Sequence, residues 1–358
     1  MNILNTIRNA LKAAGLDIGS GSLRGVRDNI RSALASSGLG REPRTQADQA
    51  LDRVAAPGQF VRRTHSTAVG SRDHWLYIPA RQAGQRAKPL PLVVMLHGCT
   101  QSADDFAVGT QMNRLADQHG FLVLYPEQAA SANAARCWNW FRAEDQVRQG
   151  GEPELIVGMV QAVVAEHGVD PQRIFVAGLS AGAAMAVILG ETYPEWFAAV
   201  GAHSGLPYAA AHDIPSAMAA MKGRPVMGHA HLPGTAHDPR RPATQAVPVI
   251  VFHGDRDHTV QPGNGAQIAE QAVRAHARKA GASGLTTVTE QGSSGTRRHT
   301  RTLHTDASGR PCVEVWTLHG AGHAWSGGDA AGSFTDRDGP NASVEMLRFF
   351  LAQTHAPS

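Results

Sequence analysis

The sequence predicts an α/β fold with a mostly parallel sheet and helices on both of its faces. The chain has 358 residues and 42% hydrophobic content, which is enough for one large domain with a substantial core. From residue 60 onward, β-rich and helical segments alternate without an internal repeat, which implies right-handed βαβ crossovers. Residues 90–96 are continuously apolar, as expected of a strand buried on both faces.

The remaining elements are assigned from residue type and spacing. Residues 60–69 and 74–79 indicate an opening hairpin. Strands are predicted where β-branched and aromatic residues cluster, and helices where apolar residues recur at helical spacing. Further strands are expected at 121–125, 173–177, 197–202, 247–252 and 313–318. Helices are expected at about 110–119, 153–167, 181–189, 264–280 and 343–352.

Two segments depart from this alternation. Residues 1–58 contain two amphipathic stretches and a polar linker, so we expect a helical, partly mobile N-terminal extension to a main domain of residues 59–358. An alternative is that residues 1–36 make a weak contact with a granule or membrane surface. Residues 205–248 are rich in Ala, Pro and His and have no clear strand, which indicates a small cap-like insertion. Its alternative is a surface loop without substrate contact.

Composition excludes several classes of protein. The net charge is only +3, and the one basic cluster, residues 297–301, alternates like the solvated edge of a strand and has no interleaved aromatic residues. We therefore expect no nucleic-acid partner. No apolar run is long enough to span a membrane, and the first 16 residues lack the unbroken apolar region of a secretory signal.

The pentapeptide Gly178-Leu179-Ser180-Ala181-Gly182 lies between a β-rich run and an Ala/Met/Ile/Leu-rich helix. A G-x-S-x-G sequence at a strand-to-helix turn is the nucleophile elbow of the α/β-hydrolase fold. The glycines are required because the turn is too tight for a Cβ on either side. The motif predicts Ser180 as a nucleophile and the backbone N–H of Ala181 as one oxyanion donor.

A serine nucleophile needs a base and an orienting acid, which in this fold follow it in the order Ser, Asp/Glu, His. Two acids, Asp255 and Asp257, follow the strand at 247–252. We favour Asp257, because its spacing lets the chain turn back toward the site, whereas Asp255 is placed to cap the turn. After the last strand, His323 is favoured as the base over His319, which lies at the strand end.

The second oxyanion donor is expected in the loop after residues 90–96, which begins His97-Gly98-Cys99. Gly98 allows close approach of the backbone, so the N–H of Cys99 is the candidate.

A metal site in the insertion at 205–248 is a further hypothesis, which the sequence supports less than a cap. Its histidines, His229, His231 and His237, have no acid or cysteine beside them to complete a coordination shell, so we expect no metal.

The three cysteines are too few for a disulfide scaffold and permit one bridge. Cys99 and Cys137 follow neighbouring predicted strands, so both should lie at the carboxyl edge of the sheet, within bridging range. Cys312 begins a later strand and should lie toward the opposite edge. The alternative is that Cys99 and Cys137 are reduced thiols of a cytosolic protein, since no signal peptide is visible.

With these loops placed, the sequence resembles the polyhydroxybutyrate-depolymerase family of esterases, which includes feruloyl and acetylxylan esterases. The resemblance covers about residues 60–352 and is carried by the four loops together with further family-like stretches. It implies the same nucleophile, acid, base and oxyanion donors, and no cofactor. It also implies secretion to the extracellular region, whereas the missing signal peptide favours the cytoplasm. Those further stretches are Tyr125–Gln128, Cys137–Phe141, His203–Gly205 and Gly339–Ala342.

The function expected from the resemblance is ester hydrolysis through an acyl-enzyme, with poly- or oligo-3-hydroxybutyrate or related short-chain esters as substrates. A feruloyl or acetylxylan esterase is the alternative. A non-catalytic granule-surface protein is the alternative of another class, which an intact triad argues against. Trp138, Trp140, Trp325 and Gln101 are candidates for substrate contact, although the tryptophans could equally belong to the core.

Overall fold

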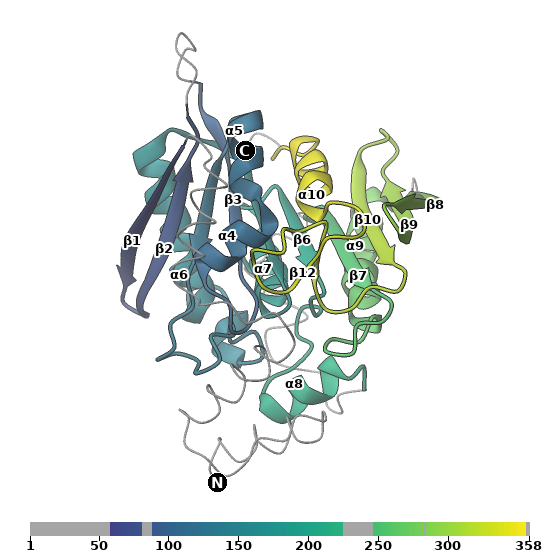
Figure 1. Ribbon diagram of the computed structural model, residues 1–358, viewed down its shortest axis with the longest axis horizontal. Coiled ribbons are helices and arrows are strands. Elements are labelled where there is room, and N and C mark those ends of the chain that lie inside the picture. The colour runs from purple at the N-terminus through teal and green to yellow at the C-terminus, as the bar shows by residue number, and fades with distance from the viewer. Residues whose placement is uncertain (1–57, 81–87, 225–245, 282–283, 356–358) are drawn as a thin grey trace. The chain divides into compact units, whose positions relative to one another are not determined.

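The computed structural model describes residues 58–80, 88–224, 246–281 and 284–355. Within these residues, ten strands form one sheet in the order β1-β2-β4-β3-β5-β6-β7-β10-β9-β8 (Figure 1). The strands are β1 Gln59–Thr67, β2 Gly70–Ile78, β3 Leu90–Leu96, β4 Leu122–Pro126, β5 Val169–Leu179, β6 Ala199–His203, β7 Val249–Gly254, β8 Thr286–Ser294, β9 Arg297–Thr305 and β10 Pro311–Leu318. A separate pair, β11 Trp325–Ser326 and β12 Thr335–Asp336, is parallel.

The six strands from β4 to β10 in this order pair in parallel, and each edge of the sheet carries an antiparallel hairpin. The opening hairpin and the mostly parallel sheet confirm the predicted fold class. The hairpin of β8 and β9 was not predicted as such. The basic cluster at 297–301 does lie in a strand, β9, whereas β8 is exposed along almost its whole length and so gives no alternation of apolar residues.

Helices cover both faces of the sheet (Figure 1). The helices are α4 Ala103–Thr110, α5 Met112–His119, the 3₁₀ helix η1 Ala143–Gln146, α6 Gly151–His167, α7 Ala181–Thr192, α8 Ile214–Met221, α9 Gly263–Ala280 and α10 Ala342–Leu351. Along β3, Leu92, Val94 and Leu96 pack in one core cluster with residues of α6, α7 and α9. Val93 and Met95 pack in the other with residues of α4, α5 and α10. The continuous apolar run of β3 follows from this burial on both faces.

The helix expected at 110–119 is α5, and a further helix that was not predicted, α4, precedes it. Ser102 caps α4 by accepting a hydrogen bond from the N–H of Asp105, so this helix begins before the predicted one. Gln111, which separates α4 from α5, has φ 54°, a left-handed conformation that interrupts helical hydrogen bonding. The break therefore lies at the backbone of a residue whose side chain gives no breaker signal.

Some expectations lie outside the described residues. They include the N-terminal extension with its surface contact at residues 1–36, and the three histidines His229, His231 and His237. Of the insertion at 205–248, the structure describes α8, which begins at a capping box made by Asp213 and Ser216. Among the described helices, none has the length and apolar character needed to cross a membrane.

Candidate active site

The turn from β5 to α7 is built by glycines around a strained serine. Ser180 has φ 57° and ψ −119°, a backbone conformation that residues other than glycine rarely adopt. A Cβ on Gly182 would lie 2.1 Å from the carbonyl oxygen of Leu96, and one on Gly178 would lie 2.4 Å from the carbonyl carbon of Gly182. Only glycine fits at either position, because the turn packs directly against the end of β3.

The backbone N–H groups of Ser180 and Ala181 differ in their hydrogen bonding. The N–H of Ser180 donates to the carbonyl oxygen of His203 at 2.9 Å, which ties the turn to the end of β6. Ala181 is the first residue of α7. Since N–H groups in the first turn of a helix have no acceptor within it, the N–H of Ala181 is available to a bound oxyanion.

Asp257 and His323 meet on the loops that follow β7 and β10. Oδ2 of Asp257 lies 2.7 Å from Nδ1 of His323, and the side chains are 0% and 12% exposed. The N–H groups of Thr259 and Val260 donate to Oδ1 of Asp257, each at 2.9 Å. Both oxygens of the carboxylate are therefore occupied, and its orientation toward His323 is fixed.

The electrostatics of this pair favour a charged acid. Burial by itself raises the pKa of Asp257, but hydrogen bonds with His253 and His323 and with backbone N–H groups outweigh it and hold this pKa well below its usual range. The carboxylate is thus ionised over the acid range. An ionised acceptor at Nδ1 keeps the proton of neutral His323 on that atom, which leaves Nε2 free to accept a proton.

The two residues that compete for these roles pair with each other instead. Oδ2 of Asp255 lies 2.9 Å from Nδ1 of His319, and Oδ1 accepts from the N–H of Gly320 at 2.6 Å. Nε2 of His319 lies 2.8 Å from Oγ1 of Thr300. Since both ring nitrogens of His319 already have partners, this histidine has no free nitrogen with which to act as a base.

His203 connects the nucleophile turn to the loop that carries His323. Its carbonyl oxygen receives the Ser180 N–H, and its Nε2 accepts from the N–H of Ser326 at 3.1 Å. Burial lowers the pKa of His203 to about 3, so the ring is neutral and acts as an acceptor. The sequence singled out this histidine only as part of a family-like stretch, because its role depends on which strands lie side by side.

The loops of the acid and the base also touch directly. A Cβ on Gly254, the last residue of β7, would lie 2.3 Å from the carbonyl oxygen of Ala321. The two loops are therefore in contact at this glycine.

In the described part of the chain no hydrogen bond joins Ser180 to His323. Catalytic hydrogen bonds are often long without substrate and shorten in the Michaelis complex. The structure thus joins Asp257 and His323 as a pair and places the Ser180 turn at the same carboxyl edge of the sheet, two strands away from β7.

The loop after β3 lies beside Ser180. A Cβ on Gly98 would be 3.6 Å from Cβ of Ser180, and the N–H of Gly98 donates to Oε1 of Gln101 at 2.9 Å. The next residue, Cys99, forms a disulfide with Cys137, and their Cα atoms are 4.2 Å apart. Cys312 is a free, buried cysteine. The expected second oxyanion donor, the Cys99 N–H, therefore belongs to a covalently fixed loop next to the nucleophile.

The four candidates for substrate contact are buried in this structure. Trp138, Trp140, Trp325 and Gln101 are 1%, 5%, 1% and 2% exposed. Nε1 of Trp138 donates to the carbonyl oxygen of His97, and Nε1 of Trp325 donates to Oγ of Ser343. The amide of Gln101 is taken up by Gly98, Asp105 and Ser333. All four are buried in the core or the loop framework, and hydrogen bonds within the protein hold Trp138, Trp325 and Gln101. Their contact with substrate stays a prediction.

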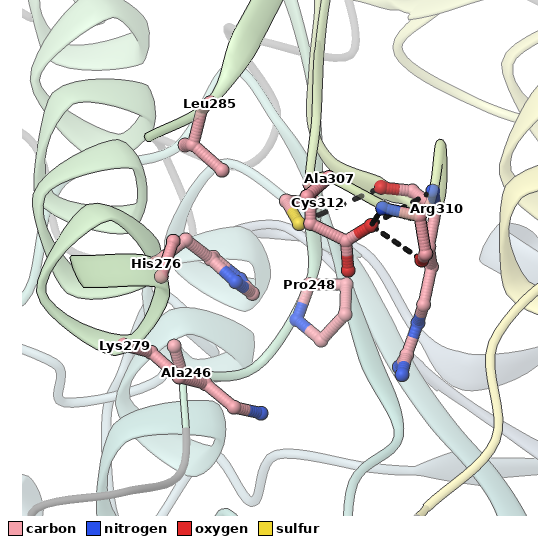
Figure 2. Close-up of a pocket in the computed structure, with 11 residues that line it drawn as sticks. Ala246, Pro248, His276, Lys279, Leu285, Ala307, Arg310 and Cys312 are labelled. Carbon is pink, nitrogen blue, oxygen red and sulfur yellow. Dashed lines mark hydrogen bonds between the residues drawn. The ribbon is translucent and has the colours of Figure 1, made fainter. Parts of the chain in front are cut away.

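A cavity of about 350 Å³ lies elsewhere, between α9, the start of β7 and the turn from β9 to β10 (Figure 2). Figure 2 shows His276, Pro248, Leu285 and Arg310 around it. None of its lining residues belongs to the loops that carry Ser180, Asp257 or His323. As far as the structure describes the chain, no three His, Cys, Asp or Glu side chains are grouped to hold a metal ion.

The known proteins that match this chain are named as esterases or depolymerases. A family model described as "Esterase PHB depolymerase" matches residues 73–292. The chain is 34% identical over 238 residues to the poly(3-hydroxyalkanoate) depolymerase C of Paucimonas lemoignei, covering 65% of this chain and 54% of that protein. It is 32% identical over 149 residues to feruloyl esterase B of Talaromyces funiculosus, covering 41% of this chain and 40% of that protein.

The chain spans about half the length of these curated relatives. Among solved structures, an acetyl xylan esterase from Aspergillus awamori matches with a TM-score of 0.59 at 18% identity, covering 82% of this chain and 99% of that one. At this identity the likeness bears on the fold alone. It agrees with the predicted α/β-hydrolase fold.

Proposed function

This chain belongs to the esterase PHB depolymerase family, and from that premise we propose that it is a serine esterase that cleaves carboxylic esters through an acyl-enzyme. The observation that carries the proposal is the buried contact of 2.7 Å between Asp257 and His323. The loops after β7 and β10 that carry this pair lie at the same carboxyl edge of the parallel sheet as the Ser180 turn after β5. Such an acid–base pair beside a strained serine is the arrangement that activates a hydroxyl nucleophile.

In the proposed mechanism, Nε2 of His323 takes the hydroxyl proton of Ser180 while Oγ attacks the ester carbonyl. The N–H groups of Ala181 and Cys99 stabilise the oxyanion of the tetrahedral intermediate. The imidazolium, stabilised by Asp257, gives its proton to the departing alcohol. Water then attacks the acyl-enzyme with His323 again as base, which releases the acid and regenerates Ser180.

We propose short-chain 3-hydroxyalkanoate esters, as polymer or oligomer, as the substrates. The identity of 34% to a poly(3-hydroxyalkanoate) depolymerase supports this choice. A feruloyl or acetylxylan ester is the second candidate, supported by the relatives named for those activities. The third possibility, a non-catalytic protein of a granule surface, requires that the Ser180, Asp257 and His323 arrangement be unused.

A substrate panel tests this proposal. Purified protein is assayed first with p-nitrophenyl butyrate, then with polyhydroxybutyrate, dimers and trimers of 3-hydroxybutyrate, and methyl ferulate. We expect hydrolysis of p-nitrophenyl butyrate, and higher kcat/KM for the hydroxybutyrate oligomers than for methyl ferulate. The reverse order of kcat/KM would favour the carbohydrate-esterase alternative. No turnover of any ester by the wild-type protein would contradict the esterase proposal itself.

We also propose that the insertion at 205–248 forms a small cap beside the site, with granule or membrane contact through residues 1–36 as a separate suggestion. The support for the cap is the attachment of α8 to the loop that follows Asp257. Nζ of Lys222 donates to the carbonyl oxygen of His258 at 3.2 Å. The N–H of Gln261 donates to the carbonyl oxygen of Met221 at 2.8 Å. A helix joined to the acid loop in this way is suited to contact the acyl or alcohol part of a substrate.

The assignment of the acid makes a sharp prediction, because the chain offers a matched pair. We expect Asp257→Asn to lower kcat by about 10³–10⁴-fold, since the amide holds the imidazole in the wrong tautomer. Asp255→Asn should lower kcat by roughly tenfold or less, because its partner His319 has no free ring nitrogen. Both are measured as initial rates with p-nitrophenyl butyrate. A larger loss in the Asp255 variant would reverse the assignment.

A further inference from the structure

We call residues 97–100, in the loop that follows β3, the oxyanion loop. Near it lies a buried carboxylate that the mechanism above does not use. Glu152, in the first turn of α6, has a side chain that is 4% exposed. Its Oε2 accepts from the backbone N–H of Asn139 at 2.7 Å, and its Oε1 accepts from Nδ2 of the same residue at 2.7 Å and from Nε2 of Gln128. Every donor points at the carboxylate, and it holds both ends of segment 128–139.

Segment 128–139 is the support on which the oxyanion loop lies. One covalent bond and three hydrogen bonds join the two pieces of chain, and all of them reach residues 97–100. The contacts are the disulfide of Cys99 and Cys137, the Thr100 N–H to the Ala135 carbonyl at 2.7 Å, Nε1 of Trp138 to the His97 carbonyl at 3.1 Å, and the Gln128 N–H to Nε2 of His97 at 3.1 Å.

The last of these contacts sets the tautomer of His97. The ring is fully buried, and burial lowers the pKa of His97 to about 4, so the imidazole is neutral. Because Nε2 accepts from the N–H of Gln128, the single ring proton lies on Nδ1. Nδ1 then donates to the carbonyl oxygen of Gly98 at 2.8 Å.

That hydrogen bond, with a longer one from the Gln101 N–H at 3.3 Å to the same carbonyl oxygen, orients the expected oxyanion donor. The carbonyl of Gly98 and the N–H of Cys99 belong to one planar trans peptide unit, so they point in opposite directions. Fixing the carbonyl oxygen with the His97 ring therefore fixes the direction of the Cys99 N–H. A hydrogen bond to the carbonyl also polarises the peptide and strengthens its N–H as a donor.

We propose that Glu152 is a positioning residue for the oxyanion hole. By holding Gln128 and Asn139 it fixes segment 128–139, and through this segment it fixes the His97 ring and the Gly98–Cys99 peptide. Glu152 itself does not touch substrate. The inference rests on the proposed esterase function, and it adds a residue that neither the triad nor the oxyanion donors include.

The hydrogen bonds from Gln128 and Asn139 favour the ionised form of Glu152, because all three come from donors and a carboxylate has only acceptors. Burial and the nearby Asp145 of η1 raise the pKa of Glu152 to about 7, against hydrogen bonds from Gln128 and Asn139 and the Arg72 guanidinium of β2 at 3.9 Å. This pKa is above its ordinary value of 4.5. The contribution of Glu152 to the free energy of unfolding is therefore fully present below pH 4.5, and it is lost as the pH rises through about 7. The folded protein is thus less stable with Glu152 ionised, which is the form that the proposed hydrogen-bond network uses, than with Glu152 protonated.

Glu152→Gln tests the proposal, because it keeps the shape of the side chain and puts an N–H₂ group where an acceptor is needed. With p-nitrophenyl butyrate we expect kcat to fall by about tenfold or more and KM to change by less than about twofold, since oxyanion donors act on the transition state. A short-chain trifluoromethyl ketone forms a tetrahedral adduct with the serine. Its Ki should rise by the same factor by which kcat/KM falls.

The matched control is Glu154→Gln, two residues further along α6 and outside this network, which should behave as wild type. Thermal unfolding of all variants checks the fold. If the Glu152 variant does not fold, Asn139→Ala removes one of the three donors, and a severalfold loss of kcat at unchanged KM is expected. A folded Glu152 variant with wild-type kcat and Ki would overturn the proposal, as would wild-type kinetics of Asn139→Ala. Absence of turnover in the wild type would instead refute the esterase function.

Discussion

Replacing Ser180 by alanine is expected to lower kcat for p-nitrophenyl butyrate by about 10⁴-fold or more, and His323→Ala by a similar factor. The first change removes the attacking oxygen, and the second removes the group that takes its proton. Because the two residues act as one unit, the double variant should lose little more than either single variant. Initial rates with substrate in excess, together with the burst of p-nitrophenol, measure all three losses.

Ser66→Ala is the matched control for this series, since Ser66 is an exposed serine of β1. It should keep wild-type kinetics. A serine-directed organophosphate should label wild-type protein once per chain and leave the Ser180 variant unlabelled. Labelling of the Ser180 variant, or additive losses in the double variant, would mean that a different residue carries the reaction.

Removal of the Cys99–Cys137 disulfide is expected to have the largest effect on stability. The bridge spans 38 residues, and closing a loop of that length stabilises a protein by roughly 3–4 kcal/mol in the chain-entropy model. We therefore expect the double variant with Ser at both positions to lose this amount of unfolding free energy. Chemical denaturation followed by fluorescence measures the change.

The same bridge also holds the oxyanion loop, so the double variant should lose kcat as well as stability, even at temperatures where it is folded. Thiol titration of denatured, unreduced wild-type protein provides the independent check. One reactive thiol, mapped to Cys312, is expected. Three reactive thiols would show that the bridge does not form in the protein as produced.

The sequence predicted the features that depend on neighbouring residues in the chain. The nucleophile turn could be recognised because its glycines, its serine and both flanking elements are contiguous. The buried strand β3 is similarly a local signal, since burial on both faces leaves a continuous apolar run. The preference for Asp257 over Asp255 also rested on local spacing, and the structure joins each of these acids to a different histidine.

Features that depend on tertiary contacts were not predictable in this way. Glu152 resembles an ordinary acid in the first turn of a helix, where a negative charge favours the helix dipole from the surface. The groups that surround it, from Gln128, Asn139 and Arg72, come from residues distant in the chain. His203 gains its role from the adjacency of β5 and β6. The sequence left the tryptophans open between core and substrate contact, because an aromatic residue beside a predicted catalytic loop has the same sequence signature in either role.

The left-handed backbone of Ser180 has a consequence for the protein as a whole. Outside the glycines, a conformation of this kind raises the energy of the folded state by about 1–3 kcal/mol. The packing of β5 and α7 must therefore hold position 180 against its own preference. The residue that we propose as the nucleophile thus has a backbone conformation that glycine would adopt more readily. If Ser180 is the nucleophile, stability and reactivity are opposed at this position, and we expect a change that loosens β5 or α7 to let the turn relax and to lower kcat.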